Sequence, residues 1–232
     1  MKLGLTPPLA IAWALSLAAC RVTNPDGYDT LREAAPEERV TATPGVMYGF
    51  APRSWDLVDG RQISVELDRA RVSSGMGLYA ADIAFDVQLE GSAAVPPLRC
   101  ETRPSGPRVP ETRFGCWSED ESVEYWVGAG RECHDRNVNA ARTLGRPECW
   151  EGTLRVGDVT YHVDFGHAGR GEWVIDRVTW TDANSAVVQA ADLVAEMRVE
   201  LYRDEALPED QRDALALHAM ALHQWVHVQS PS

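Results

Sequence analysis

Lysine is almost absent from this 232-residue sequence, because Lys2 is its only lysine and every other basic residue is an arginine. Acidic residues outnumber basic ones by 35 to 22, which gives a formal net charge of −13 at pH 7. A nucleic-acid-binding surface needs clustered positive charge to contact phosphates. The charge balance therefore argues against a nucleic-acid partner and is compatible with a basic protein partner.

The sequence also lacks, at its N-terminus, an apolar run long enough to cross a membrane. A membrane-spanning helix needs about 20 apolar residues. The run at 9–19 is shorter than that, is broken by Ser16, and follows a short positive start at Lys2. These features are typical of a signal peptide. The run stops at Cys20, where the chain becomes polar.

The tetrad Leu17-Ala18-Ala19-Cys20 resembles the lipobox of bacterial lipoproteins, in which a leucine and two small residues precede the lipidated cysteine. The resemblance implies that residues 1–19 are cleaved, that Cys20 carries a diacylglycerol, and that an acyl chain such as palmitate is added to the new amino terminus. Several acyl chains hold a protein stably on a bilayer. Because Arg21 rather than an aspartate follows Cys20, the resemblance implies the outer membrane rather than the inner one. An ordinary secretory signal is the alternative. Cleavage leaves 21 arginines against 35 acidic residues, a net charge of −14.

Four cysteines remain after Cys20 is set aside: Cys100, Cys116, Cys133 and Cys149. An even number in an exported chain predicts two disulfides, and three pairings are possible. The chain repeats the pattern C-x15-C-W, once from Cys100 and once from Cys133. This duplicated unit favours the local pairs Cys100–Cys116 and Cys133–Cys149. A zinc site made of the four thiolates is the weaker alternative, because there is no C-x2-C pair.

Strand patterns dominate the middle of the chain. After a polar segment with three prolines at 20–45, expected to be a flexible tether, apolar and polar residues alternate in several runs. The runs are at 63–67, 83–89, 159–165 and 173–180, the last with an expected bulge near Asp176 and Arg177. A β-rich domain is therefore predicted over 46–184.

The pattern changes after Asn184, where apolar residues from Val187 to Leu201 recur at helical spacing. Pro208 and the acids after it are typical of a second helix start. Helices over 185–230, packed on the β domain, are expected, with a final strand as the alternative for the first of them. The predicted fold class is α+β: an antiparallel β-sheet or sandwich with disulfide-stapled loops and a C-terminal helical segment.

Three clusters of polar residues are candidates for chemistry. His162, Asp164 and His167 lie close together in sequence, and the first two share a strand face, which is a minimal arrangement for a general base or a metal. Near the C-terminus His223 and His227, with His218 upstream, would share a helix face that can bind zinc or copper. The segment 135–139 resembles the start of an EF-hand calcium loop, but Ala140 stands where that loop needs glycine. Chance placement on solvated or packed faces is the competing explanation for each cluster.

No nucleophile elbow, phosphate loop or nucleotide fingerprint is present in the sequence. The leading hypothesis is therefore a non-enzymatic, lipid-anchored envelope protein that faces the periplasm or the cell surface and acts as a binding or structural module. No cofactor is expected. This hypothesis predicts an exposed apolar patch with an acidic margin. The alternatives are a metal-dependent hydrolase that uses His162, Asp164 and His167, and an acidic inhibitor or immunity-type lipoprotein for a basic envelope hydrolase.

Overall fold

The computed structural model describes residues 24–44, 52–75, 78–92, 94–102, 112–129, 150–167, 175–193 and 198–229. These residues form two helices, α1 (Tyr28–Ala34) and α4 (Glu209–Gln229), and twelve strands. The strands are β1 (Glu37–Pro44), β2 (Pro52–Asp56), β3 (Gln62–Gly75), β4 (Leu78–Leu89), β5 (Leu98–Thr102), β6 (Thr112–Ser118), β7 (Val123–Ala129), β8 (Trp150–Val156), β9 (Val159–His167), β10 (Ile175–Thr181), β11 (Val187–Asp192) and β12 (Arg198–Arg203).

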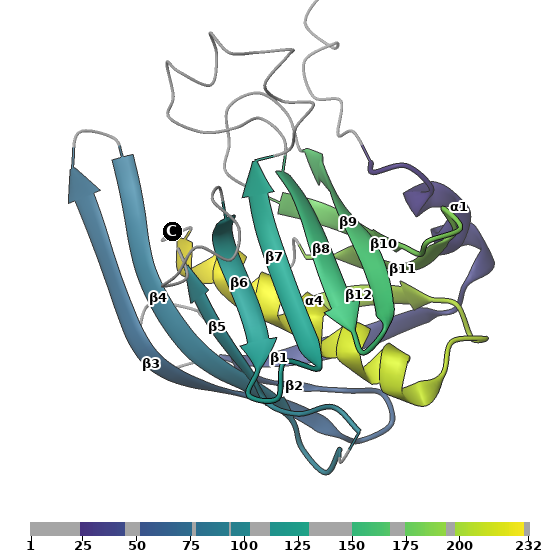
Figure 1. Cartoon of the computed structure of the whole chain (residues 1–232), viewed down its shortest axis with the longest axis horizontal. Coiled ribbons are helices and arrows are strands. Elements are labelled where there is room, and N and C mark those ends of the chain that lie inside the picture. Colours follow the sequence, from purple (N-terminus) through teal and green to yellow (C-terminus); the bar gives the residue numbers. More distant parts are fainter. Residues whose placement is uncertain are drawn as a thin grey trace, which may run out of the picture.

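The twelve strands close into one antiparallel barrel (Figure 1). Each strand pairs with its neighbours in sequence, and β1 pairs with β12, with Val40 opposite Val199. Closure leaves no unpaired strand edge, which removes a template for aggregation. The expected α+β sheet or sandwich is therefore wrong, because the first and last strands complete a single closed sheet.

Two segments differ from their expected structures in a way that explains the closure. The expected tether at 20–45 contains α1 and β1, and β1 pairs with both β2 and β12. The first expected C-terminal helix is instead the strand pair β11 and β12. Together these segments supply three strands of the barrel, β1, β11 and β12, which lie outside the β domain expected at 46–184.

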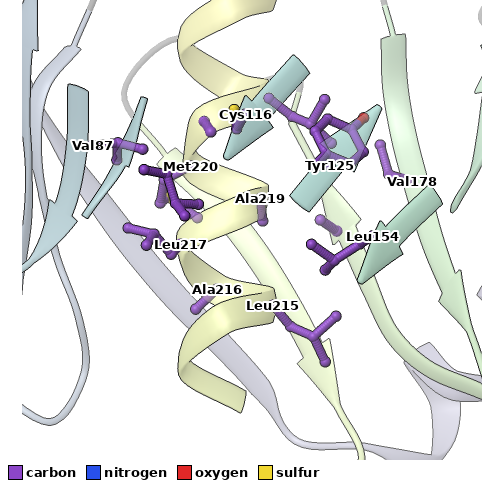
Figure 2. Close-up of a cluster of buried hydrophobic side chains, with 14 of the residues drawn as sticks. Val87, Cys116, Tyr125, Leu154, Val178, Leu215, Ala216, Leu217, Ala219 and Met220 are labelled. Carbon is purple, nitrogen blue, oxygen red and sulfur yellow. The ribbon is translucent and has the colours of Figure 1, made fainter. Parts of the chain in front are cut away.

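The second expected C-terminal helix is confirmed, but α4 lies inside the barrel and not on its surface. Every residue of α4 from Asp213 to Val226 is buried. Figure 2 shows α4 between Val87 of β4 on one side and Tyr125 and Leu154 of the opposite wall on the other. A helix that is buried on all sides forms the core of its domain, so α4 fills the barrel.

Alternating side chains line the barrel wall as the sequence predicts. On β4, Ile83, Phe85, Val87 and Leu89 are all buried. On β9, Tyr161 and Val163 are buried while His162 is exposed. The register between β9 and β10 shifts between Ile175 and Val178, which confirms the expected bulge.

The two ends of the barrel carry different connections. Shorter connections, at 57–61, 90–97, 119–122, 157–158 and 182–186, lie at the end that we call the turn rim. The other end, which we call the loop rim, is where β1, β3, β5, β7, β9 and β11 end. Because α4 follows β12 through 204–208, it enters the barrel at the turn rim. Near its far end Trp225 stacks on Phe114 of β6, with ring centroids 4.8 Å apart.

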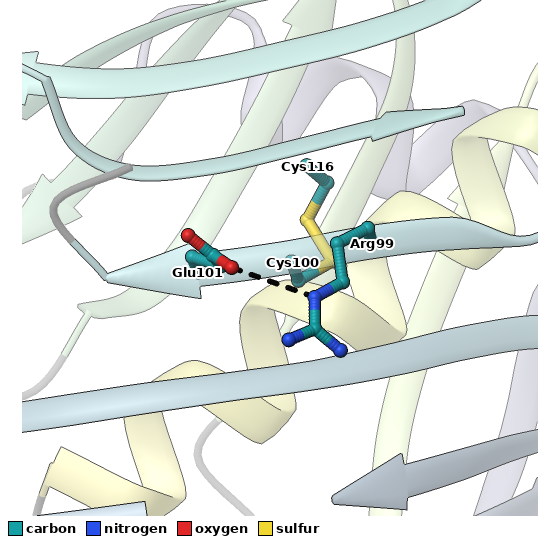
Figure 3. Close-up of a disulfide and its surroundings, with 4 residues drawn as sticks. All are labelled: Arg99, Cys100, Glu101 and Cys116. Carbon is teal, nitrogen blue, oxygen red and sulfur yellow. Dashed lines mark ion pairs between the residues drawn. A yellow bond between two sulfur atoms is a disulfide. The ribbon is translucent and has the colours of Figure 1, made fainter. Parts of the chain in front are cut away.

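A disulfide joins Cys100 of β5 to Cys116 of β6, which confirms the first local pair (Figure 3). The two cysteines are directly opposite in the strand register, and both are buried in the core. The ion pair between Arg99 and Glu101 lies on the other face of β5, with 3.5 Å between the side-chain atoms. Cys133 and Cys149, the second expected pair, lie outside the described residues.

Loss of the Cys100–Cys116 bridge is expected to lower the free energy of unfolding by about 3 kcal/mol, because the bridge closes a loop of about 15 residues in the unfolded chain. The double variant Cys100→Ala/Cys116→Ala, compared with the parent by urea denaturation, measures the effect. Each buried cysteine loses only its sulfur, so the β5–β6 pairing should survive. An unchanged denaturation midpoint in the double variant would contradict a stabilising role for the bridge.

Candidate functional site

The sequence-predicted pair on β9 is formed in the structure. His162 Nε2 lies 3.0 Å from Asp164 Oδ1, and both side chains are exposed, by 51% and 42%. The strand register places Thr153 of β8 and Thr181 of β10 on either side of His162. An imidazole beside a carboxylate can accept and pass on a proton, but here the pair lies on the outer wall in contact with water. His167 ends β9, and its side chain is outside the described part of the structure.

Within the described ranges, no group of three or more histidine, cysteine, aspartate or glutamate side chains is close enough to hold a metal ion. The expected calcium loop at 135–139 lies outside these ranges, so the structure does not place Asp135, Asn137 or Asn139.

The two helix histidines that the structure describes are packed core groups. Trp180 of β10 donates its indole N–H to His218 Nδ1 at 2.7 Å, and Trp55 of β2 donates to His223 Nδ1 at 3.2 Å. Both imidazoles are buried. Because the indole nitrogen can only donate, each Nδ1 must be an unprotonated acceptor. The nitrogen that His223 would offer a metal together with His227 is thus already in use, and the side chain of His227 is outside the described residues.

Burial lowers the pKa of His218 well below its ordinary value, because an imidazolium ion would lose its hydration inside the barrel. The ring of Tyr125 on β7 lies against His218, with centroids 3.5 Å apart. Burial likewise raises the pKa of the Tyr125 hydroxyl well above its ordinary value, so Tyr125 is neutral too. The middle of α4 is therefore surrounded by uncharged aromatic groups.

Polar contacts fix α4 where it enters the turn rim. Arg61 donates two hydrogen bonds to the carboxylate of Asp213, at 2.6 and 2.8 Å. These bonds and those to Asp59 raise the pKa of Arg61 above its ordinary value. Tyr161 donates to the Gln211 side chain at 2.7 Å. A bidentate arginine–carboxylate pair has a defined geometry, so these bonds set the position of α4 along the barrel axis.

The described outer wall carries ion pairs that cross several strands. Arg99 lies 2.5 Å from Asp68 and 3.1 Å from Asp86 across three strands. Among the described residues, the one large hydrophobic side chain that is exposed is Val58. The apolar patch with an acidic margin, expected for a binding module, is therefore not found in the described part of the surface.

A further site, not predicted from the sequence, is the docking site of the N-terminal segment, for which a tether at 20–45 was expected. Tyr28 of α1 is fully buried on the outer wall against Tyr202 of β12, with ring centroids 6.2 Å apart. The guanidinium carbon of Arg177 lies 5.2 Å from the centre of the Tyr28 ring. Arg177 also donates a hydrogen bond to the side-chain oxygen of Asn24, whose amide nitrogen donates to Asp29 at 2.8 Å.

These contacts hold α1 tightly on β10, β11 and β12. Burial raises the pKa of the Tyr28 hydroxyl above its ordinary value, and the nearby carboxylate of Asp192 raises it further. An arginine over a buried tyrosine ring is a favourable cation–π contact. The N-terminal segment from Asn24 to Ala34 therefore belongs to the folded domain. A sequence signal was present in Pro25 and Tyr28, which are the two buried residues of this segment.

Gly27 allows this close approach, and replacing it is expected to destabilise the protein. Its φ of +75° is unfavourable for other residues, and a Cβ there would lie 2.4 Å from Val187 Cγ2. Gly60 is the matched control, because its φ is +86° but a Cβ would meet nothing within 4 Å. Gly60→Ala should cost about 1 kcal/mol and Gly27→Ala about 2–3 kcal/mol in unfolding free energy. Urea denaturation of both variants checks this. Equal losses would mean that α1 is not packed closely on β11.

The described helices include none that is long and apolar enough to span a membrane. No family model, no curated protein and no solved structure matches this chain, so the fold and the described candidate sites stand on their own geometry.

Proposed function

We propose that the chain is a lipid-anchored cell-envelope protein whose barrel is a non-enzymatic binding or structural module, attached through lipid on Cys20. The observation that carries this proposal is the position of α4. A small barrel whose interior is filled by its own helix uses that interior as a core and not as a chamber for a ligand. The surface available for recognition is then the charged outer wall and the two rims.

The charge of the barrel supports a basic partner. The mature chain, with 21 arginines against 35 acidic residues, has a net charge of −14. Complementary charge raises association rates and excludes wrongly charged partners. A basic envelope protein fits this surface, and inhibition of a basic hydrolase is one form that such binding could take. The outer membrane, through the resemblance at Cys20, is the proposed location.

Intact mass of the protein from its native host tests the proposal first. The expected mass lacks residues 1–19, carries diacylglycerol and acyl groups on Cys20, and rises by four hydrogens on reduction if both expected disulfides are present. Peptide mapping then assigns Cys133 and Cys149. An unlipidated mature chain would overturn the anchored function.

A metal-dependent hydrolase that uses His162, Asp164 and His167 is the competing function, and calorimetry with zinc separates the two. Under the proposal, wild type and His162→Ala give the same weak heats. Tight binding that is lost in His162→Ala, but kept in the buried-site variant His223→Gln, would favour the hydrolase instead.

A further inference from the structure

The N-terminal docking site determines which side of the barrel can face a membrane. The described part of the chain begins at Asn24, which is fixed to Arg177 on β10. Cys20 precedes Asn24 by only four positions in the sequence. Whatever conformation it adopts, a link of four residues spans at most about 14 Å. A lipid on Cys20 would therefore enter the bilayer within that distance of Asn24.

We propose that α1 and the outer face of β10, β11 and β12 form the membrane-proximal side of the barrel, with a phospholipid bilayer as the surface that they face. This inference rests on the proposed lipid anchor at Cys20. It replaces the tether expected at 20–45, which would leave the barrel free to turn in any direction, by a short link with a fixed attachment point.

The attachment point is fixed because its contacts are specific. Gly27 packs against Val187, Tyr28 is fully buried, and Arg177 contacts both Tyr28 and Asn24. Arg177 also forms an ion pair with Asp192, at the end of β11 and close to the loop rim. The docking site thus extends along this wall, from Arg177 and Asp192 near the loop rim to Val187 at the turn-rim end of β11.

The opposite wall then faces away from the membrane and is available to a partner. In the closed strand order β4 is six strands from β10 in either direction, so the two are diametrically opposed. The exposed side chains of Gln88 and Glu90 lie at the turn-rim end of this opposite wall. Arg99 and its carboxylate partners Asp68 and Asp86 lie on the same side.

Energy transfer from the protein to acceptor-labelled lipid tests the orientation. The lipidated full-length chain, bound to phosphatidylethanolamine–phosphatidylglycerol vesicles, carries a fluorescent unnatural amino acid either at Thr30 of α1 or at Gln88 of β4, both exposed. Transfer to headgroup acceptors is expected to be at least twofold more efficient from Thr30 than from Gln88. Inserting 20 glycine and serine residues between Thr23 and Asn24 gives a flexible spacer of about 25 Å. It should abolish most of that difference while leaving lipid and fold unchanged.

The outcomes are distinguishable. Lipid on Cys20 together with equal transfer from both positions, or a difference that survives the spacer, overturns the orientation but leaves the lipid anchor intact. A mature chain without lipid on Cys20, seen by mass, overturns both the anchor and the orientation. Strong transfer from Thr30 that the spacer removes supports both.

Discussion

A chain that ends at Leu207 is expected to lose the cooperative fold of the barrel, whereas a chain that ends at Gln229 is expected to keep it. The difference between the two is α4. Four large apolar side chains of this helix, Leu215, Leu217, Met220 and Leu222, are fully buried. Truncating one such side chain in a core costs about 2–5 kcal/mol, and small proteins have only about 5–15 kcal/mol of stability in total. Losing all four at once exhausts that stability.

The wall cannot compensate for the missing helix. Its inward side chains pack on α4, as Phe114 does on Trp225 and Tyr125 on His218. Without α4 these apolar groups would surround a space that the backbone hydrogen bonds of a closed barrel keep open. Near-UV circular dichroism and size-exclusion chromatography of the two truncated chains measure the effect. A Leu207 truncation with the melting curve of the full chain would show that α4 is not the core.

A pair of point variants separates the burial of α4 from its mere presence. Met220→Asp places a charge in the core and is expected to unfold the protein, because an unpaired buried charge costs several kcal/mol. Glu209→Ala changes an exposed residue in the first turn of the same helix and should shift stability by about 0.5 kcal/mol or less. Similar melting temperatures for the two variants would place α4 on the surface instead.

Strands that face the core on one side and solvent on the other were predictable from the sequence, whereas strands that pack against protein on both faces were not. On β4, the buried Phe85 and Val87 alternate with the more exposed Asp86 and Gln88, because one face of the strand packs on α4 and the other faces water. On β11, Gln189 bonds to the backbone of α4 and Ala191 lies in the main core, while Val187 and Ala190 lie under α1. The four residues from Val188 to Ala191 are all buried. Burial on both faces removes the alternation of period two, and the remaining apolar residues can be matched to a helix.

The contacts of the candidate sites also fall into two kinds: local contacts, which the sequence predicts, and contacts between distant residues, which it does not. The pair His162 and Asp164 was predictable because residues two apart share a strand face. The indole partners of the helix histidines were not, because Trp180 is 38 residues from His218, and Trp55 is 168 residues from His223. Only the closed topology brings these groups together. For the same reason a histidine pattern typical of a metal-binding helix is here a pattern of buried hydrogen-bond acceptors.

The free energy of unfolding is expected to fall as the pH is lowered below about 6.5, by up to about 1.4 kcal/mol per pH unit from His218 alone. Burial lowers the pKa of His218 in the folded protein, whereas in the unfolded chain it has its ordinary value. The unfolded state therefore binds more protons over the interval between the two pKa values. The stability that depends on neutral His218 is complete above the unfolded pKa and is lost progressively below it.

Protonation is unfavourable in the fold for a reason visible in the contacts of His218. Its Nδ1 accepts the Trp180 N–H at 2.7 Å, so a proton there would replace a hydrogen bond by two opposed donors. The ring of Tyr125 lies on another side, and the nearest charged pair described along α4 is Arg61 with Asp213 at the turn rim, more than one helical turn away in sequence. An imidazolium ion at this position would thus be buried among aromatic groups without a carboxylate to balance it.

His218→Gln is expected to flatten the pH dependence, because a glutamine oxygen can accept the Trp180 N–H and does not titrate. His162→Gln is the matched control, since His162 is exposed on β9, and it should leave the slope from His218 in place. Urea denaturation between pH 7.5 and 5.5 measures the slope while most carboxylates stay ionised. A full slope in His218→Gln would assign the acid sensitivity to another group. If the slope is lost only in His218→Gln, the neutral imidazole of His218 in the core is the group that makes the free energy of unfolding depend on pH.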